Sequence, residues 1–130
     1  MARAQTTRVY GELSYLRDTF EVCVLHGLAT LGTGDDECHP YYTASNLVFG
    51  NSQISSIPTP PGHGFPKVTF VNDGSGITHT LEATFGNKAS SHLRGKGLLL
   101  QRQSSGTWEC VTQGGLEPKW APIECRNGSP

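Results

Sequence analysis

The feature that most constrains this chain is the placement of its four cysteines, at positions 23, 38, 110 and 125, in two sequentially close pairs. An even number of cysteines in a small, loop-rich domain is typical of disulfides formed in an oxidising compartment. A Cys23–Cys38 bridge would tie an irregular segment to the end of a helix. A Cys110–Cys125 bridge would close a loop, with a stabilisation of about 3 kcal/mol in the chain-entropy model. The pattern therefore favours irregular backbone held covalently against regular elements.

The length of 130 residues predicts a single domain, residues 1–130, large enough to bury a real core. Charged residues make up only 16% of the chain, while it contains 16 Gly and 8 Pro, which favours strands and loops over a helical bundle. The formal net charge of −1 gives no broad basic footprint for nucleic acid. Disulfides imply export, yet the N-terminus has no signal-peptide pattern. We therefore interpret the sequence as a piece whose targeting segment is missing.

Residues 3–26 are expected to form an amphipathic helix. Its buried stripe follows spacings of four and three residues: Val9, Leu13, Leu16, Phe20 and Cys23/Val24. Gly11 costs about 1 kcal/mol relative to Ala inside a helix, so we expect it to mark a bend or a close packing contact. Gly27 is expected to cap the C-terminus, because it reaches positive φ without a Cβ clash.

The rest of the chain divides into a loop, a sheet and a second loop. Residues 27–66 show no sustained period, and a structureless stretch of this length is usually functional or held by other means. Residues 67–112 are predicted to form an antiparallel sheet. "GITHTLEATF" alternates cleanly, "NDGSG" before it is typical of a hairpin turn, and "GLLLQRQ" and "TWECVT" form a second hairpin about residues 104–106. Trp108, Cys110 and Thr112 should share one face of the last strand.

Candidate chemistry is sparse. Cys23, His26, Cys38 and His39 are ligand types that suit zinc, but Cys38 and His39 are adjacent, so a disulfide beside two exposed histidines is the favoured alternative. His79 lies on the apolar face of its strand with no nucleophile or carboxylate motif to support catalysis. "TGDDE" lacks the spacing of a calcium loop, and "NGS" at 127–129 matches a glycosylation sequon by its letters alone. We expect no enzymatic activity, no metal and no cofactor.

The terminal loop, residues 110–125, is left as the candidate functional segment. Leu116, Trp120 and Ile123 lie on a stretch too short to bury all three, and tryptophan is enriched at binding hot spots. A purely stabilising role and a contact role remain open together.

Several motifs resemble the type IVa pilins of Gram-negative bacteria. "ARAQ" at 2–5 followed by an amphipathic helix resembles the stretch after the membrane-spanning half of the long pilin helix. "RVYGELSYLRDTFEVCVLHG" followed by "C…YYTASNL" at 38–47 resembles a subgroup in which a cysteine near the helix end pairs with one in the next loop. "W-x-C…P-x-x-C", here Trp108–Cys110 and Pro122–Cys125, resembles the disulfide-bounded loop at the pilin C-terminus.

This resemblance implies an α+β pilin fold: one N-terminal helix packed on a four-stranded antiparallel sheet, with disulfides Cys23–Cys38 and Cys110–Cys125. It also implies that the exposed faces of loops 27–66 and 110–125 contact other subunits or ligands. The candidate contact residues in the second loop are Gly114, Gly115, Leu116, Lys119, Trp120 and Pro122.

The function that the resemblance implies is that of a structural pilus subunit. Such subunits polymerise through an apolar N-terminal helix, which this sequence lacks, and which holds them in the inner membrane before assembly. The expected partners are other pilin subunits in a helical homopolymer at the cell surface, together with a host receptor, phage or DNA. The fibres serve adhesion, twitching motility, DNA uptake or phage attachment. The alternatives are a minor pilin, a type II secretion pseudopilin, or a secreted binding module that uses Trp120 with Tyr41 and Tyr42.

Overall fold

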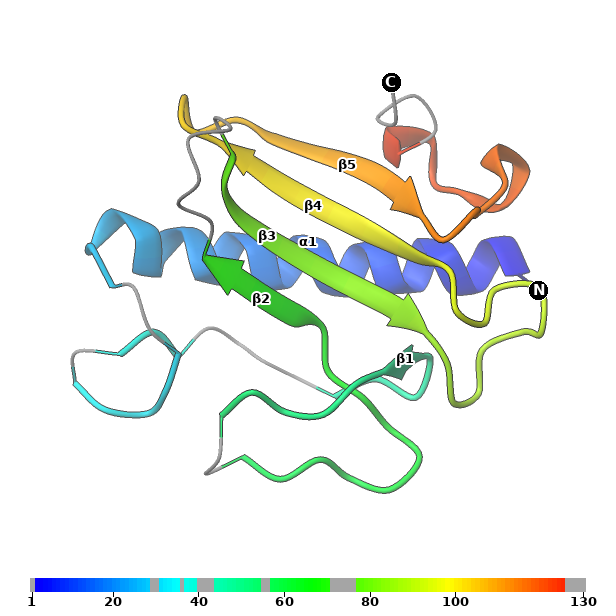
Figure 1. Ribbon diagram of the computed structural model, residues 1–130, viewed down its shortest axis with the longest axis horizontal. Helices are drawn as coiled ribbons and strands as arrows, with labels where there is room; N and C mark the ends of the chain where they lie inside the picture. Colours follow the sequence, from blue (N-terminus) through cyan, green and yellow to red (C-terminus); the bar gives the residue numbers. More distant parts are fainter. Residues whose placement is uncertain are drawn as a thin grey trace.

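The computed structural model describes residues 2–28, 31–35, 37–39, 44–54, 57–70 and 77–125. Its elements are α1 (Ala2–Leu25), β1 (Val48–Phe49), β2 (Lys67–Phe70), β3 (Ile77–Phe85), β4 (Gly97–Gln103) and β5 (Trp108–Gln113), followed by the 3-10 helices η1 (Pro118–Trp120) and η2 (Ile123–Cys125). Figure 1 shows α1 lying behind the sheet along the longest axis of the molecule, with its N-terminal end at the right. The predicted α+β fold of one helix on an antiparallel sheet is confirmed.

Helix α1 is built as its pattern predicts. Val9, Leu13 and Phe20 are fully buried, and Leu16 and Cys23 nearly so, because they repeat on one face of the helix. At the C-terminus Gly27 adopts φ 74°, Gly27 N–H donates to Val24 O over 3.0 Å, and Leu28 N–H donates to Cys23 O over 3.1 Å. This is the glycine cap expected from the sequence.

The close packing contact expected at Gly11 is absent from the described residues, whereas a bend there stays a prediction. A Cβ at this position would meet no atom within 4 Å, and α1 continues through Gly11 without a break. Within the described part of the chain, nothing packs closely against Gly11, so its cost to the helix is not recovered there.

The sheet has the order β1-β3-β4-β5, and β2 also pairs with β3. Short β1 pairs with the end of β3 (Val48↔Phe85), while β2 pairs with its first half (Lys67↔Glu82 to Phe70↔His79), so both lie along one edge of β3. The expected four strands are therefore present, with two residues of the predicted loop 27–66 added as β1. The β4–β5 hairpin confirms the second predicted hairpin, whereas the turn at 72–76 lies outside the described residues.

The loop before the sheet is more regular than its sequence indicates. Leu31 bridges Cys38, and Ser45 bridges Gly64, with Ser45 N–H donating to Gly64 O over 2.8 Å. The sequence gives no periodic signal for such isolated pairings, because each involves single residues far apart in the chain. They form because buried backbone polar groups need partners.

The core lies between α1 and the inner face of the sheet. Leu81, Ala83 and Phe85 of β3, Leu98 and Leu100 of neighbouring β4, and Cys110 of β5 are all buried. The period-two alternation of β3 placed its apolar residues on this face, as the sequence predicted. No helix in the described ranges is both long enough and apolar enough to cross a lipid bilayer.

Candidate functional site

The bridged loop, residues 110–125, turns sharply as it leaves β5. Gly114 and Gly115 have φ values of 69° and 82°, in the left-handed region that favours glycine. A Cβ on Gly114 would lie 2.7 Å from Gly95 O and 2.9 Å from Lys96 Cα. Gly114 is thus needed for close approach to the connection between β3 and β4, and its contact role stays a prediction.

The loop then folds back over two 3-10 turns and is closed by the Cys110–Cys125 disulfide, with a Cα–Cα distance of 4.7 Å. Ala121 and Cys125 are fully buried, Leu116 is 4% exposed, and Pro122 is also buried. Leu116 and Pro122 were expected as surface contacts, and that expectation is wrong. They form the inner side of the loop, because apolar groups this close to the main core gain more from burial than from exposure.

The outer side of the loop carries a surface made of Lys119, Trp120 and His92, called here the Trp120 surface. The rings of His92 and Trp120 stack with centroids 6.0 Å apart and an interplanar angle of 26°. The Lys119 Nζ lies 5.0 Å from the Trp120 ring centroid, within cation–π range, and 3.4 Å from a Glu117 carboxylate oxygen. The surface therefore combines a half-exposed indole with an imidazole stacked on it and one ammonium group.

Two anchors fix this surface to the N-terminal half of α1. The Thr6 hydroxyl, fully buried, donates to Trp120 O at short distance and lies 2.9 Å from Arg3 O. The Gln5 side-chain carbonyl accepts from Ser90 N–H over 2.8 Å, which holds the His92 segment against the same helix turn. Sequence reasoning missed Thr6, Gln5 and His92, since only the packed structure brings helix, connection and loop together.

Ile123 is the large apolar residue that the loop leaves outside, with 73% of its surface exposed. The sequence predicted that Leu116, Trp120 and Ile123 could not all be buried, and the structure orders them as buried, half-buried and exposed. Gly114, Gly115 and Lys119 are also exposed. The contact role of Lys119 and Trp120 stays a prediction that their position allows.

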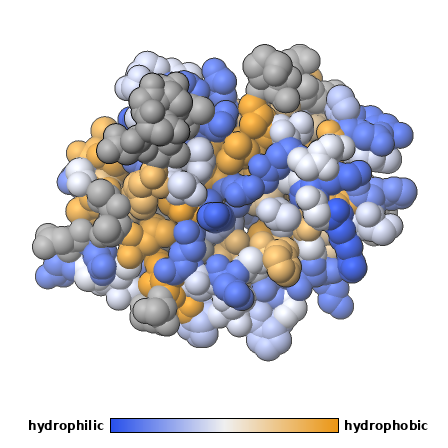
Figure 2. Space-filling view, viewed as in Figure 1, coloured by the Kyte–Doolittle hydropathy of each residue, from blue (hydrophilic) through white to orange (hydrophobic). Residues whose placement is uncertain are grey.

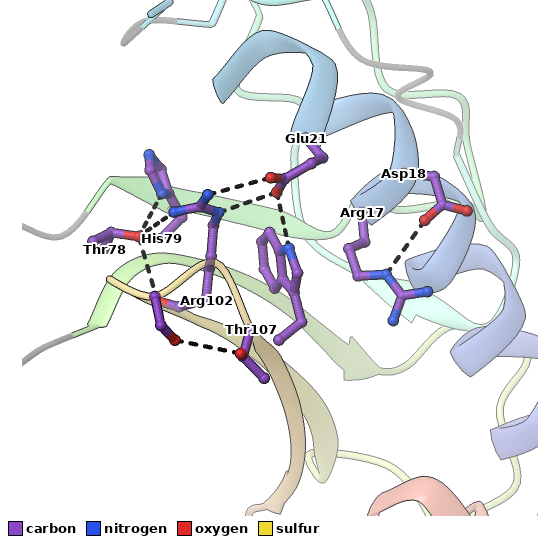
Figure 3. A network of polar contacts seen from close by, with 9 residues as sticks. Arg17, Asp18, Glu21, Thr78, His79, Arg102 and Thr107 are labelled. Carbon is purple, nitrogen blue, oxygen red and sulfur yellow. Dashed lines mark hydrogen bonds and ion pairs between the residues drawn. The ribbon is translucent and has the colours of Figure 1, made fainter. Parts of the chain in front are cut away.

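A polar network lies at the opposite end of α1 (Figure 3). The Glu21 carboxylate accepts from Arg102 Nε over 3.0 Å and Nη2 over 3.2 Å, and from Trp108 Nε1 over 3.0 Å. The Arg102 hydrogen bonds hold the pKa of Glu21 below its ordinary value, against the opposing effect of burial, and the Trp108 bond acts in the same direction as Arg102. Glu21 therefore clamps α1 to β4 and β5.

His79 lies beside this clamp on the inner face of β3. Its ring contacts Phe20 and Phe70 edge-on, with centroids 5.3 and 5.4 Å away, and its Nδ1 lies 2.9 Å from the Thr78 hydroxyl. Burial lowers the pKa of His79, and the Arg102 charge lowers it further. A neutral histidine packed among phenylalanines is consistent with a partly buried core residue and not with a catalytic base.

The Cys23–Cys38 disulfide is incompatible with the alternative of a zinc site at these cysteines. Cys23 and Cys38 form a disulfide with a Cα–Cα distance of 5.4 Å, so neither sulfur is a thiolate that could bind zinc. Among the residues that the structure describes, no group of His, Cys, Asp and Glu is arranged to hold a metal. Tyr41, Tyr42 and the sequon at 127–129 lie outside the described residues.

The outer face of the sheet carries a hydrophilic band (Figure 2) and a hollow of about 210 Å³ where β1 and β2 meet β3. Its lining residues are Phe49, Gly50, Asn51, Gln53, Phe65, Lys67, Glu82 and Thr84. This lining holds one amine and one carboxylate but no nucleophile beside a base, so it has no arrangement for catalysis.

Comparison with known proteins agrees with this architecture. A family model described as Pilin, a bacterial filament protein, matches residues 2–126. The chain is 38% identical to a probable minor fimbrial protein of Dichelobacter nodosus, over 97% of this chain and 76% of that protein. It is 32% identical to the type IV major fimbrial protein FimA of the same organism, over 98% and 77%, and 30% identical to a fimbrial protein of Pseudomonas aeruginosa, over 95% and 76%.

Proposed function

Because the chain belongs to the pilin family and is a structural, non-enzymatic subunit of a surface pilus, we propose that the Trp120 surface gives the fibre its adhesive contacts. The supporting observation is that Trp120 is half-exposed while its ring stacks on His92, lies within cation–π range of Lys119, and its backbone carbonyl accepts from Thr6. An aromatic ring that is already ordered loses little conformational entropy when it binds a partner.

Assembly with other pilin subunits is implied by the family. We propose that unassembled subunits reside in the inner membrane. We also propose that the assembled fibre mediates twitching motility, DNA uptake or phage attachment. Membrane fractionation of cells blocked in assembly tests the first point. Loss of each behaviour in a deletion strain, with recovery on complementation, tests the others.

The adhesive role is tested with Trp120→Ala in cells that make the fibre. We expect normal amounts of sheared fibre and a loss of cell attachment of about tenfold, the size typical of one buried aromatic contact in an interface. Ile123→Ala is the matched control, because Ile123 is in the same loop and is exposed but outside the ring stack. Equal attachment of both variants and the wild type, with equal fibre, would remove the proposal.

The relatives include both minor and major fimbrial proteins, with 38% identity to the first and 32% to the second. We propose the minor subunit as a second candidate, on the strength of the higher identity. Quantifying the chain in sheared fibres separates the two: a major subunit accounts for most of the fibre mass, and a minor subunit for a small fraction.

A further inference from the structure

Two loops of opposite charge lie at opposite ends of the longest axis of this nearly neutral chain (Figure 1). The connection between β3 and β4, residues 86–96, carries Lys88, Arg94 and Lys96, and is called here the basic loop. The disulfide-tied segment 31–39 carries Asp35 and Glu37 in its described part, and is called the acidic loop. In Figure 1 the acidic loop lies at the left end and the basic loop at the right end.

Contacts with α1 fix this separation. Gln5 holds the basic loop through Ser90, and Cys23 holds the acidic loop through Cys38. The two helix positions are about 27 Å apart at 1.5 Å per residue. The two loops of one subunit are therefore too far apart to neutralise each other, and at physiological salt the Debye length of about 8 Å screens what remains.

Both loops are held in place before any partner arrives. Ala89 and Leu93 anchor the basic loop in the core, with 4% and 0% exposure. In the acidic loop Cys38 is fully buried, Gly32 N–H donates to Cys38 O over 3.0 Å, and Glu37 accepts from Gly34 N–H over 2.9 Å. The charges are thus carried on ordered backbone rather than on tails.

The charges of both loops lack internal ion pairs within the described ranges. Lys88, Arg94, Lys96, Asp35 and Glu37 are absent from the ion pairs of the structure. Arg94 instead donates to the carbonyls of Asn87 and Ala89, which position the guanidinium without neutralising it. Eight other charged side chains are paired with one another: Arg8 with Glu12, Arg17 with Asp18, Arg102 with Glu21, and Lys119 with Glu117.

From this geometry we propose that the basic loop of one subunit docks on the acidic loop of a second copy of the chain, end to end, in the fibre. The inference rests on the proposed role as a pilus subunit and adds the surface that joins neighbouring heads. The partner is a second copy because the chain itself supplies both complementary surfaces at its two ends, a heterologous contact of the kind that generates open filaments. The contact between the two loops should weaken as salt is added, because the charges that form it are exposed to solvent.

Zero-length carbodiimide crosslinking of sheared fibres tests the contact, because it joins a lysine amine to a carboxylate only when the two touch. We expect mass spectrometry to find Lys88 or Lys96 joined to Asp35 or Glu37. Such a link must be between subunits, since the helix positions that hold the two loops of one chain are about 27 Å apart. Fibres that contain the chain but yield none of these links would overturn the inference while leaving the proposed function intact. Absence of the chain from fibres would overturn both.

Charge-swapped variants give the second arm. K88E/K96E and D35K/E37K should each lose the link and reduce fibre yield, and the combined variant should regain both with the charges exchanged. The matched control is K67E/E109K, which reverses charges on the outer sheet face away from both loops. Thermal unfolding of K88E/K96E should be unchanged, because both side chains are at least partly exposed. D35K/E37K also removes the Glu37 hydrogen bond to Gly34 N–H, and K67E places a second carboxylate opposite Glu82, so a small fall in Tm is expected for these two variants. If K88E/K96E keeps a normal fibre yield but loses retention of double-stranded DNA, the basic loop serves a polyanion and the inference is wrong.

Discussion

Replacing Glu21 with Gln should expose how much of the helix–sheet packing depends on one carboxylate. Glu21 accepts two hydrogen bonds from Arg102 and one from Trp108, and the Glu21 and Arg102 side chains are only 29% and 14% exposed. Glutamine keeps the shape but loses the charge, and it leaves a largely buried guanidinium without its counter-ion. A charge-assisted pair in this setting is worth about 1–3 kcal/mol of unfolding free energy. That corresponds to a fall in Tm of about 3–10 °C for a domain of this size.

The sign of the pH dependence follows from the lowered pKa of Glu21. A depressed carboxyl pKa stabilises the fold above the unfolded-state value near 4.5, and this contribution is lost as pH falls through the folded-state pKa. Urea unfolding of wild type and E21Q should therefore differ at pH 7 and converge in acid below pH 4.5. Equal stability at pH 7, or a gap that persists in acid, would refute the assignment of the stabilisation to this ion pair.

Three further predictions concern other parts of the frame. Peptide mapping under non-reducing conditions should recover Cys23–Cys38 and Cys110–Cys125 links, and crossed links would overturn the topology. The C110S variant should reduce surface fibres, because loss of the disulfide impairs subunit folding. Wild-type amounts of pili in the C110S strain would count against a structural role of the Cys110–Cys125 bridge. Gly114→Ala should cost about 1–3 kcal/mol in urea unfolding, because its φ of 69° and the 2.7 Å approach to Gly95 O both oppose a Cβ; no change would contradict the close packing. His79 has a lowered pKa, so unfolding free energy should fall as pH drops below the unfolded value of 6.5, where only the unfolded chain binds the proton. In His79→Gln the unfolding free energy should not fall with pH in this way. A fall equal to that of the wild type would assign the proton uptake to a group other than His79.

The helix and the main strands could be predicted from the sequence because their signals are local and periodic. The stripe from Val9 to Cys23 and the alternation along β3 each record which residues face a core. Residues without a periodic signal were misjudged. Leu116 was expected as a surface contact and is buried, and no pattern marked Glu21, which clamps the helix to the sheet.

The candidate site was located in the sequence only as a segment. The tryptophan and the cysteines marked the loop 110–125, but the partners that order Trp120 are His92 on another connection and Thr6 on the helix. Spacing along the chain carries no information about such pairs, since they meet through packing of separate elements. The charge separation was hidden for the same reason, because a net charge of −1 sums over the two ends.

Taken alone, the order of residues determined the helix, the strand pattern, the glycine cap at residue 27 and the membership of a disulfide-containing α+β class. These depend on backbone preference and on periodicity, which act over a few neighbouring residues. Tertiary structure decided which apolar groups of the terminal loop turned inward, which side chains hold Trp120, and how the charges are distributed between the two ends. Those outcomes depend on competition for a shared core and on distances across the fold, quantities that exist only once the elements have packed.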